Sequence, residues 1–255
     1  MDITLLGVAV VPVIILLFYI YRKDKTQKEP LGLLLRAFFL GSLSVIPAGL
    51  MEGVLQVFAP GDSYPVADGL FTGFVVAGVS EELWKLLLLT LAVWKSREFD
   101  EYFDGIVYAT FVSLGFACVE NIGYVFGQTG FDAAFSTGVM RGVLAVPAHF
   151  LFGVMMGYFF SLAKFDPPHR GRNLIKAFAV PALMHGTYDS LLMVSERVGT
   201  QEDLMITEGV LLIVFIIFDI KMWKWGIRRI KRLQEWSQEE NFDREDPFRG
   251  FTWDV

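Results

Sequence analysis

Two adjacent glutamates and a lysine, Glu81, Glu82 and Lys85, lie inside an apolar run from Leu70 to Trp94 that is long enough to cross a bilayer. Each charged group at that depth costs about 2.5–3.5 kcal/mol on insertion scales. Such groups are retained mainly where they pair with one another and serve a reaction or a transport path. Because Lys85 follows Glu81 by four residues and Glu82 by three, we expect it to neutralise either carboxylate on its own helix.

Ionisable residues recur in three later apolar runs: Glu120 in one, His149 in the next, and His185 with Asp189 in a third. Counted from the charged end of each run at a rise of 1.5 Å per residue, the side chains of all four runs lie about 14–24 Å into the membrane. Snorkelling residues would scatter toward the two interfaces instead. The common depth therefore predicts one shared polar site. Within it, Asp189 is four residues from His185 and is expected to fix the imidazole tautomer.

Carboxylates and imidazoles without a serine or cysteine partner favour chemistry on an activated water molecule. A buried glutamate can take a proton from water and return it to a leaving amine, while a histidine binds the developing oxyanion. Alternatively, glutamates and histidines from several helices hold a zinc ion that activates the water. Both describe a membrane-embedded hydrolase of peptide bonds. A cation or proton transporter would use similar residues, and a non-catalytic scaffold could use them only for packing.

Composition identifies the elements that must position these residues. Hydrophobic residues make up 54% of the 255 residues and are concentrated in blocks, as in membrane proteins. The single cysteine, Cys118, excludes an intrachain disulfide and a cysteine-based zinc site. We predict an all-α polytopic membrane protein, a bundle of about seven transmembrane helices near residues 3–21, 31–51, 70–94, 103–126, 140–163, 174–194 and 204–225.

Lysines and arginines indicate the orientation of this bundle. They follow the first, third, fifth and seventh predicted spans, whereas only Arg141 and Arg197 fall on the other side. The bias of basic residues to the cytoplasmic face predicts a multi-pass cell-membrane protein with its N-terminus outside and its C-terminus in the cytoplasm. We divide the chain into a transmembrane domain, residues 1–226, and a cytoplasmic tail, residues 227–255, that is basic first and acidic later. The lipid bilayer is an expected partner, and no nucleic acid is.

Three short motifs in this order resemble those of the PrsW family of intramembrane proteases. EELWK (81–85) matches EExxK, FACVE (116–120) matches FxxxE, and HGTYD (185–189) matches HxxxD. The stretch RGVLAVPAH, which runs from Arg141 to His149, is also similar to the family pattern. The CAAX-processing membrane proteases of the wider superfamily have EExxxR and FxxxH instead. Lys85 and Glu120 depart from those patterns, which favours PrsW over a prenyl-protein endopeptidase.

The resemblance implies a glutamate-dependent or metal-dependent protease that makes the first cut in a single-pass substrate such as a membrane-anchored anti-sigma factor. Glu81 would be the base toward water, assisted by Glu82 and tuned by Lys85. Glu120 would be a second acid–base group or a metal ligand. Arg141, at the outer end of the fifth predicted span, is expected to be an interface anchor or a partner of Glu120. His149 and His185 would bind the oxyanion or a metal, and Asp189 would orient His185. If zinc is present, the expected ligands are Glu82, Glu120, His149 and His185.

Overall fold

The computed structural model describes residues 2–199 and 205–245, and all regular structure in them is helical. The remaining residues, including the end of the predicted acidic tail, lie outside the described part. In chain order the helices are α1 (Ile3–Lys23), α2 (Leu31–Gln56), α3 (Pro65–Phe71), α4 (Ser80–Val93), α5 (Asp104–Phe126), α6 (Phe131–Val143), α7 (Ala145–Phe165), α8 (Arg170–Gly199) and α9 (Met205–Glu245). A π-helical segment, Thr72–Val79, joins α3 to α4, and a 3₁₀ turn, Pro167–His169, precedes α8.

The all-α prediction is confirmed for the described residues, and four of the predicted spans qualify as membrane-crossing by length and hydropathy. These are α1, α2, α5 and the continuous apolar run of α6 and α7. Helical segments also occupy the other three predicted spans, where crossing of the membrane remains a prediction. Exposed Ile14, Phe18 and Phe39 on α1 and α2 fit contact with lipid rather than with water.

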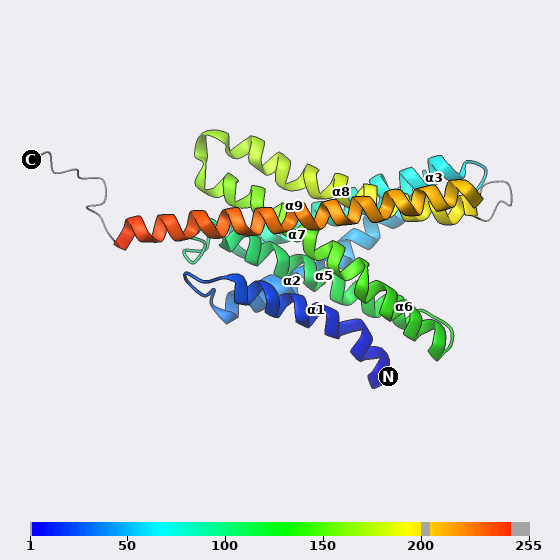
Figure 1. The fold of residues 1–255 in the computed structure, drawn as a ribbon, viewed down its shortest axis with the longest axis horizontal. Coiled ribbons are helices and arrows are strands. Elements are labelled where there is room, and N and C mark those ends of the chain that lie inside the picture. Colours follow the sequence, from blue (N-terminus) through cyan, green and yellow to red (C-terminus); the bar gives the residue numbers. More distant parts are fainter. Residues whose placement is uncertain (1, 200–204, 246–255) are drawn as a thin grey trace, which may run out of the picture.

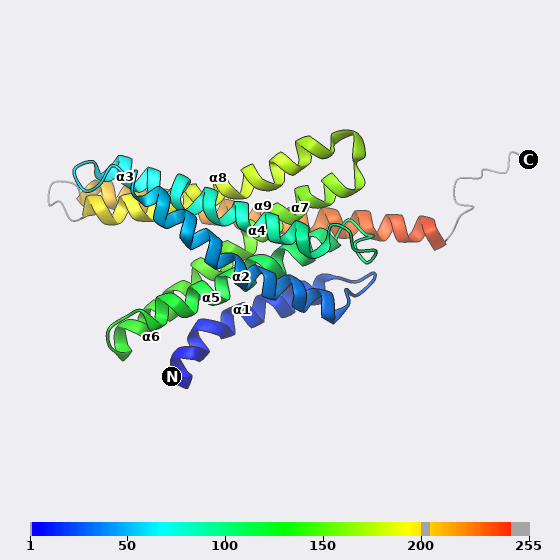
Figure 2. The ribbon, with the colours of Figure 1, turned by 180° about the vertical axis from the view of Figure 1, so that it is seen from behind.

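Helices α5 and α7 form the centre of the bundle, since most of their side chains are buried. Figures 1 and 2 show α9 running along the longest axis of the molecule, past α7 and α8. Small residues allow the central helices to approach closely. A Cβ atom at Gly157 would overlap the carbonyl oxygen of Gly105, and one at Gly41 would overlap that of Val112. Such small-residue contacts are typical of helices packed within a membrane.

The predicted fifth span, residues 140–163, has the wrong start. The helical run begins at Phe131 and breaks at Leu144, so that α6 and α7 are separate helices. Pro147 explains the break, because it has no backbone N–H to donate to the carbonyl of Val143. Helix α9 runs without interruption through residue 226. The end of the transmembrane domain that we placed there stays a prediction.

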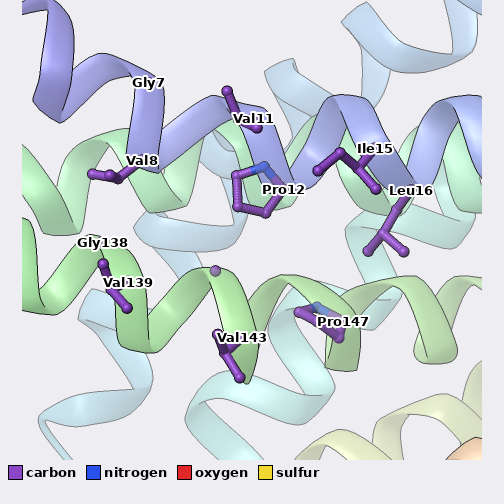
Figure 3. Close-up of a pocket in the computed structure, with 11 residues that line it drawn as sticks. Gly7, Val8, Val11, Pro12, Ile15, Leu16, Gly138, Val139, Val143 and Pro147 are labelled. Carbon is purple, nitrogen blue, oxygen red and sulfur yellow. The ribbon is translucent and has the colours of Figure 1, made fainter.

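An apolar groove of about 560 Å³ separates α1 from the α6–α7 junction (Figure 3). Gly138 and Gly142 of α6 bring the two elements together, since a Cβ at either position would press on Val8 or Pro12 of α1. The groove is lined only by apolar residues, glycines and prolines. It therefore contributes packing and a lipid-facing surface to the fold, but no chemical group.

Carboxyl groups are buried at the end of the bundle where α1 ends and α5 begins. Asp24, Glu29 and Asp104 are 1%, 5% and 0% exposed. Both carboxylate oxygens of Asp24 lack a hydrogen-bond partner within the described residues. Burial raises the pKa of Asp24 from 3.8 to about 6, with a further contribution from the charge of Glu101. Burial and the neighbouring Asp104 also raise the pKa of Glu29.

We predict that Asp24→Asn stabilises the protein at pH 8 but not near pH 4. The folded wild type binds the Asp24 proton more strongly than the unfolded chain does, so its stability falls as the pH rises from about 4 to about 6. Asparagine carries no titrating proton, so the stability of Asp24→Asn does not fall over this pH range through this side chain. The thermal unfolding midpoint in detergent, measured at both pH values against the exposed Glu98→Gln as control, tests this; a less stable Asp24→Asn at pH 8 would contradict it.

Candidate active site

The predicted polar residues meet where α4, α5, α7 and α8 pack together. Helix α4 contributes Glu81, Glu82 and Lys85, and α5 contributes Glu120. Helix α7 contributes His149, and α8 contributes His185 and Asp189. Arg141 reaches the group from the last turn of α6. All eight residues that we singled out from the sequence thus belong to one connected cluster.

The ammonium group of Lys85 lies at the centre of this cluster. Its Nζ donates to Glu81 Oε2 at 2.9 Å and to Glu82 Oε1 at 2.8 Å, and it lies 3.1 Å from His149 Nδ1. The Lys85 side chain is fully buried, and its Nζ is 4.1 Å from the centroid of the Phe116 ring. Lys85 therefore bonds both carboxylates at once, as its spacing predicted, and the ring of the FxxxE motif adds a cation–π contact.

His185 is fixed through both of its ring nitrogens. Its Nδ1 lies 2.9 Å from Glu82 Oε1, and its Nε2 lies 3.2 Å from Asp189 Oδ2. The ring of Phe152 stacks against the imidazole, with centroids 4.6 Å apart and planes 20° from parallel. The predicted contact between His185 and Asp189 is confirmed, and Glu82 joins α4 to α8 through the same ring.

His149 shows the same arrangement on the opposite side of Lys85. Its Nε2 lies 2.9 Å from Glu120 Oε2, while its Nδ1 points to Lys85. Its backbone carbonyl accepts a 2.6 Å hydrogen bond from Ser113 Oγ. Each histidine thus turns Nδ1 toward the α4 carboxylates and lysine, and Nε2 toward an outer carboxylate. Metal-binding histidines typically show this pattern, with the second nitrogen bonded to a carboxylate.

Arg141 pairs with Glu120, which is one of the two roles that we expected for it. Arg141 Nη2 donates to Glu120 Oε2 at 2.7 Å, and Arg141 Nε donates to Asn121 Oδ1 at 2.9 Å. The guanidinium also lies over the ring of Tyr124, 3.8 Å from its centroid. Asn121 in turn donates to the carbonyl of Ala9 on α1 at 2.7 Å. This chain of contacts ties the α6 end of the site to α5 and α1.

Irregular helix geometry places the α4 glutamates. The π-helical segment Thr72–Val79 ends directly before Ser80, and such bulges are common at functional sites. It packs tightly on α8, because a Cβ on Gly78 would come within 2.8 Å of the Ala182 carbonyl, and one on Gly186 would overlap the Phe74 ring. These glycines allow the backbone of α4 to approach α8 closely enough for Glu82 to reach His185.

Burial divides the cluster into a closed part and an open part. The side chains of Glu82 and Lys85 are fully buried, and those of Glu81, His149 and His185 are 7%, 5% and 4% exposed. Asp189 and Glu120 are 21% and 19% exposed. They line a cavity of about 180 Å³ together with Arg141 and the two histidines. The cluster is therefore open on the side of Glu120 and Asp189 and closed on the side of Glu82 and Lys85.

Four donor groups of this cluster are suited to a metal ion. Ligand atoms of Glu81, Glu82, His149 and His185 all lie within 4.8 Å of one another. Two imidazoles and carboxylates form a donor set that zinc accepts. The unpartnered Glu82 Oε2 leaves additional acceptor capacity there. This group differs at one position from the zinc ligands that we expected from the sequence. It contains Glu81 in place of Glu120, whose Oε2 lies 2.9 Å from His149 Nε2.

The charges of the cluster also favour an additional cation. Its four carboxylates, Glu81, Glu82, Glu120 and Asp189, face only two permanently charged cations, Lys85 and Arg141. With neutral imidazoles the group carries two net negative charges, which is costly inside a membrane. Protons or one divalent cation would neutralise them.

A helical membrane protein with clustered carboxylates and imidazoles around a small internal cavity has the make-up of an intramembrane hydrolase. The family model described as "PrsW family intramembrane metalloprotease" matches residues 29–220. The chain belongs to this family, which confirms the resemblance of its motifs.

Three curated relatives, each named protease PrsW, match nearly the whole chain. The protein of Clostridioides difficile (strain 630) is 33% identical over 95% of this chain and 96% of its own. That of Geobacillus kaustophilus (strain HTA426) is 35% identical over 93% and 95%, and that of Bacillus subtilis (strain 168) is 34% identical over 89% and 94%. No solved structure matches.

Sequence reasoning missed the residues that support the cluster from behind. Phe152 and Ser113 have types that occur throughout membrane helices, so no local pattern distinguishes them. Phe116 was part of a recognised motif, but its contact with Lys85 depends on how α5 and α4 pack. Only Asn121, a polar residue beside Glu120 in an apolar run, carried a visible signal.

We predict that Lys85→Gln strongly destabilises the fold. Removing the ammonium leaves the buried Glu82 carboxylate without its charged partner on α4, and breaking a buried ion pair in this way costs about 3–5 kcal/mol. Thermal unfolding in detergent with a chelator present measures the effect, with the exposed Lys25→Gln as matched control. Equal midpoints for the two variants would contradict a central role of Lys85 in the packing.

Proposed function

We propose that this protein hydrolyses a peptide bond of a single-pass membrane protein, with Glu81 as the base that accepts a proton from water. The observation that carries the proposal is the contact of Glu81, Glu82, Lys85, His149 and His185 within one buried cluster that opens into a cavity. A general base must lie within hydrogen-bond reach of its water, and Glu81 is the more exposed of the two α4 carboxylates.

The other residues have separate roles in this proposal. Lys85 holds both α4 carboxylates in place, and Asp189 and Glu120 orient the imidazoles of His185 and His149. Arg141, with its guanidinium beside the cavity, stabilises negative charge at its open side. Glu81 returns the proton to the leaving amine, so that no covalent enzyme intermediate is needed.

Glu82, His149 and His185 would hold the metal that the family description implies. Catalytic zinc is usually held by three protein ligands, which leaves Glu81, the fourth donor of the group, free to act as base. When bound, zinc would lower the pKa of a water molecule at the site. Glu120 and Asp189 would then fix the two histidines from their outer nitrogens.

The substrate and the orientation rest on the sequence. The resemblance to PrsW supports an anti-sigma factor as the single-pass substrate, cut in the first step of its degradation. The basic residues that follow α1, α4 and α7 support an outside N-terminus and a cytoplasmic C-terminus. In this orientation the open side of the cluster, near the end of α5, faces the outer half of the membrane.

We predict that Glu81→Gln lowers the cleavage rate at least about 100-fold, the usual minimum loss when a general base is removed. The variant should still fold, because glutamine keeps the size of the side chain. The assay is cleavage of a co-reconstituted single-pass substrate, and the exposed Asp62→Asn should cleave like the wild type. Uptake of cations or protons into protein-containing liposomes without any cleavage would favour a transporter instead.

We further predict one zinc ion per chain, lost in Glu82→Gln and His185→Ala but retained in Glu120→Gln. The donor groups of the first two lie in the four-residue group, whereas Glu120 only bonds the outer nitrogen of His149. Metal content of the purified variants, measured together with cleavage, distinguishes a ligand from a positioning group. If Glu120→Gln lost zinc while Glu82→Gln and His185→Ala kept it, Glu120 would be identified as a ligand. Full cleavage by metal-free protein would contradict the metal-dependent form of the proposal.

A further inference from the structure

A second cleft follows the catalytic cluster along α4, from Leu87 to the end of the helix, and shares no lining residue with the cavity of the cluster. It separates the start of α2 from the end of α4, has a volume of about 620 Å³, and is walled by Leu33, Leu87 and Leu91. Figure 2 shows α2 and α4 side by side along this stretch. Leu87 and Leu91 are 46% and 62% exposed, so that the cleft opens on the lipid-facing side of the bundle. Its walls suit a hydrocarbon chain.

The rim of this cleft is cationic. Arg36 lies on α2 about 8 Å above the helix start, and Lys95 follows the last turn of α4. Both side chains are exposed and line the cleft. Arg36 Nη2 donates to the carbonyl of Leu91 at 3.0 Å. The ion pairs among the described residues include neither Arg36 nor Lys95, so this guanidinium and this ammonium are available to an anion.

Two further cations, Lys164 and Arg170, contact Trp94, which also lines the cleft. Lys164 Nζ donates to the carbonyl of Trp94 at 2.8 Å and lies 5.7 Å from the centroid of its ring. Arg170 lies over that ring at 5.8 Å. Neither joins an ion pair with a carboxylate of the described chain. Four cations around one tryptophan thus form a positive patch, and none of them forms an ion pair with a carboxylate of the described residues.

We propose that this cleft binds an anionic phospholipid, with an acyl chain between α2 and α4 and the headgroup phosphate on Arg36 and Lys95. Basic pockets between membrane helices on the positively charged side are suited to such headgroups. A free phosphate would match the cations but not the apolar walls. Basic residues that serve only topology would need no cleft, and Arg36 lies within a helix rather than in a loop.

The test uses the full chain in detergent and adds dioleoyl phosphatidylglycerol or dioleoyl phosphatidylcholine. We expect saturable binding of phosphatidylglycerol by native mass spectrometry and a matching rise in the thermal unfolding midpoint. Removing a single cation at the membrane surface should weaken binding about fivefold. Arg36→Gln and Lys95→Gln should each show this loss, and the double variant a larger one. Arg97→Gln, an exposed residue of the same segment that does not line the cleft, is the matched control.

Three outcomes would overturn the proposal: equal binding of phosphatidylcholine, equal weakening by Arg97→Gln, and the same stabilisation by glycerol phosphate alone. The last would identify a phosphate site without a lipid. If loss of its bond to Leu91 keeps Arg36→Gln from folding, Lys95→Gln decides, since the exposed Lys95 side chain makes no hydrogen bond or ion pair with the described residues. An unchanged affinity of Lys95→Gln would then count against the proposal.

Discussion

The need to keep charge neutral inside the membrane shapes the centre of this protein. Lys85 is fully buried, and it is stable there only because two carboxylates, an imidazole nitrogen and the Phe116 ring surround its ammonium group. Each of those partners is in turn fixed by a group on another helix. Glu82 bonds His185 of α8, and His149 of α7 bonds Glu120 of α5. One buried cation thereby determines how four helices pack around it.

Contacts within one helix could be predicted from the sequence, because helical spacing fixes them. The pairs Glu81–Lys85, Glu82–Lys85 and His185–Asp189 are three or four residues apart, and all three are formed. The common depth of the polar residues also predicted that their helices share one site. Which side chain meets which across helices depends on rotation and close approach of the backbones, and sequence spacing does not contain this information. For that reason the contact of Glu120 Oε2 with His149 Nε2 could not be predicted from the sequence.

The sequence predicted which segments are helical better than it predicted the residues at which each helix begins and ends. Hydropathy identified an apolar run at residues 140–163, but polar and small residues before it hid a further helix, α6, that begins at Phe131. Pro147 lacks the backbone N–H that would continue the helix, and the chain breaks three residues before it, at Leu144. The π-helical turn before Glu81 has no sequence signal beyond its glycines. The π-helical segment ends two residues before Glu81, and the break at Leu144 lies five residues before His149. The features that were hardest to predict therefore position residues of the cluster.

The cluster has a closed part and an open part, and the two differ in their access to water. Glu82 and Lys85 have no exposed surface, so they cannot exchange protons with water and serve to fix charge and geometry. Glu120, Arg141 and Asp189 line the cavity and keep about a fifth of their side-chain surface exposed, so this is the side from which our proposal has the peptide and water approach. The two histidines lie between these parts, with Lys85 and Glu82 on one side and the cavity on the other. Glu81 lies beside them, bonded to Lys85, and its side chain is 7% exposed. In the role of base that we propose for it, Glu81 would be held in place by Lys85 and would meet water through its small exposed surface.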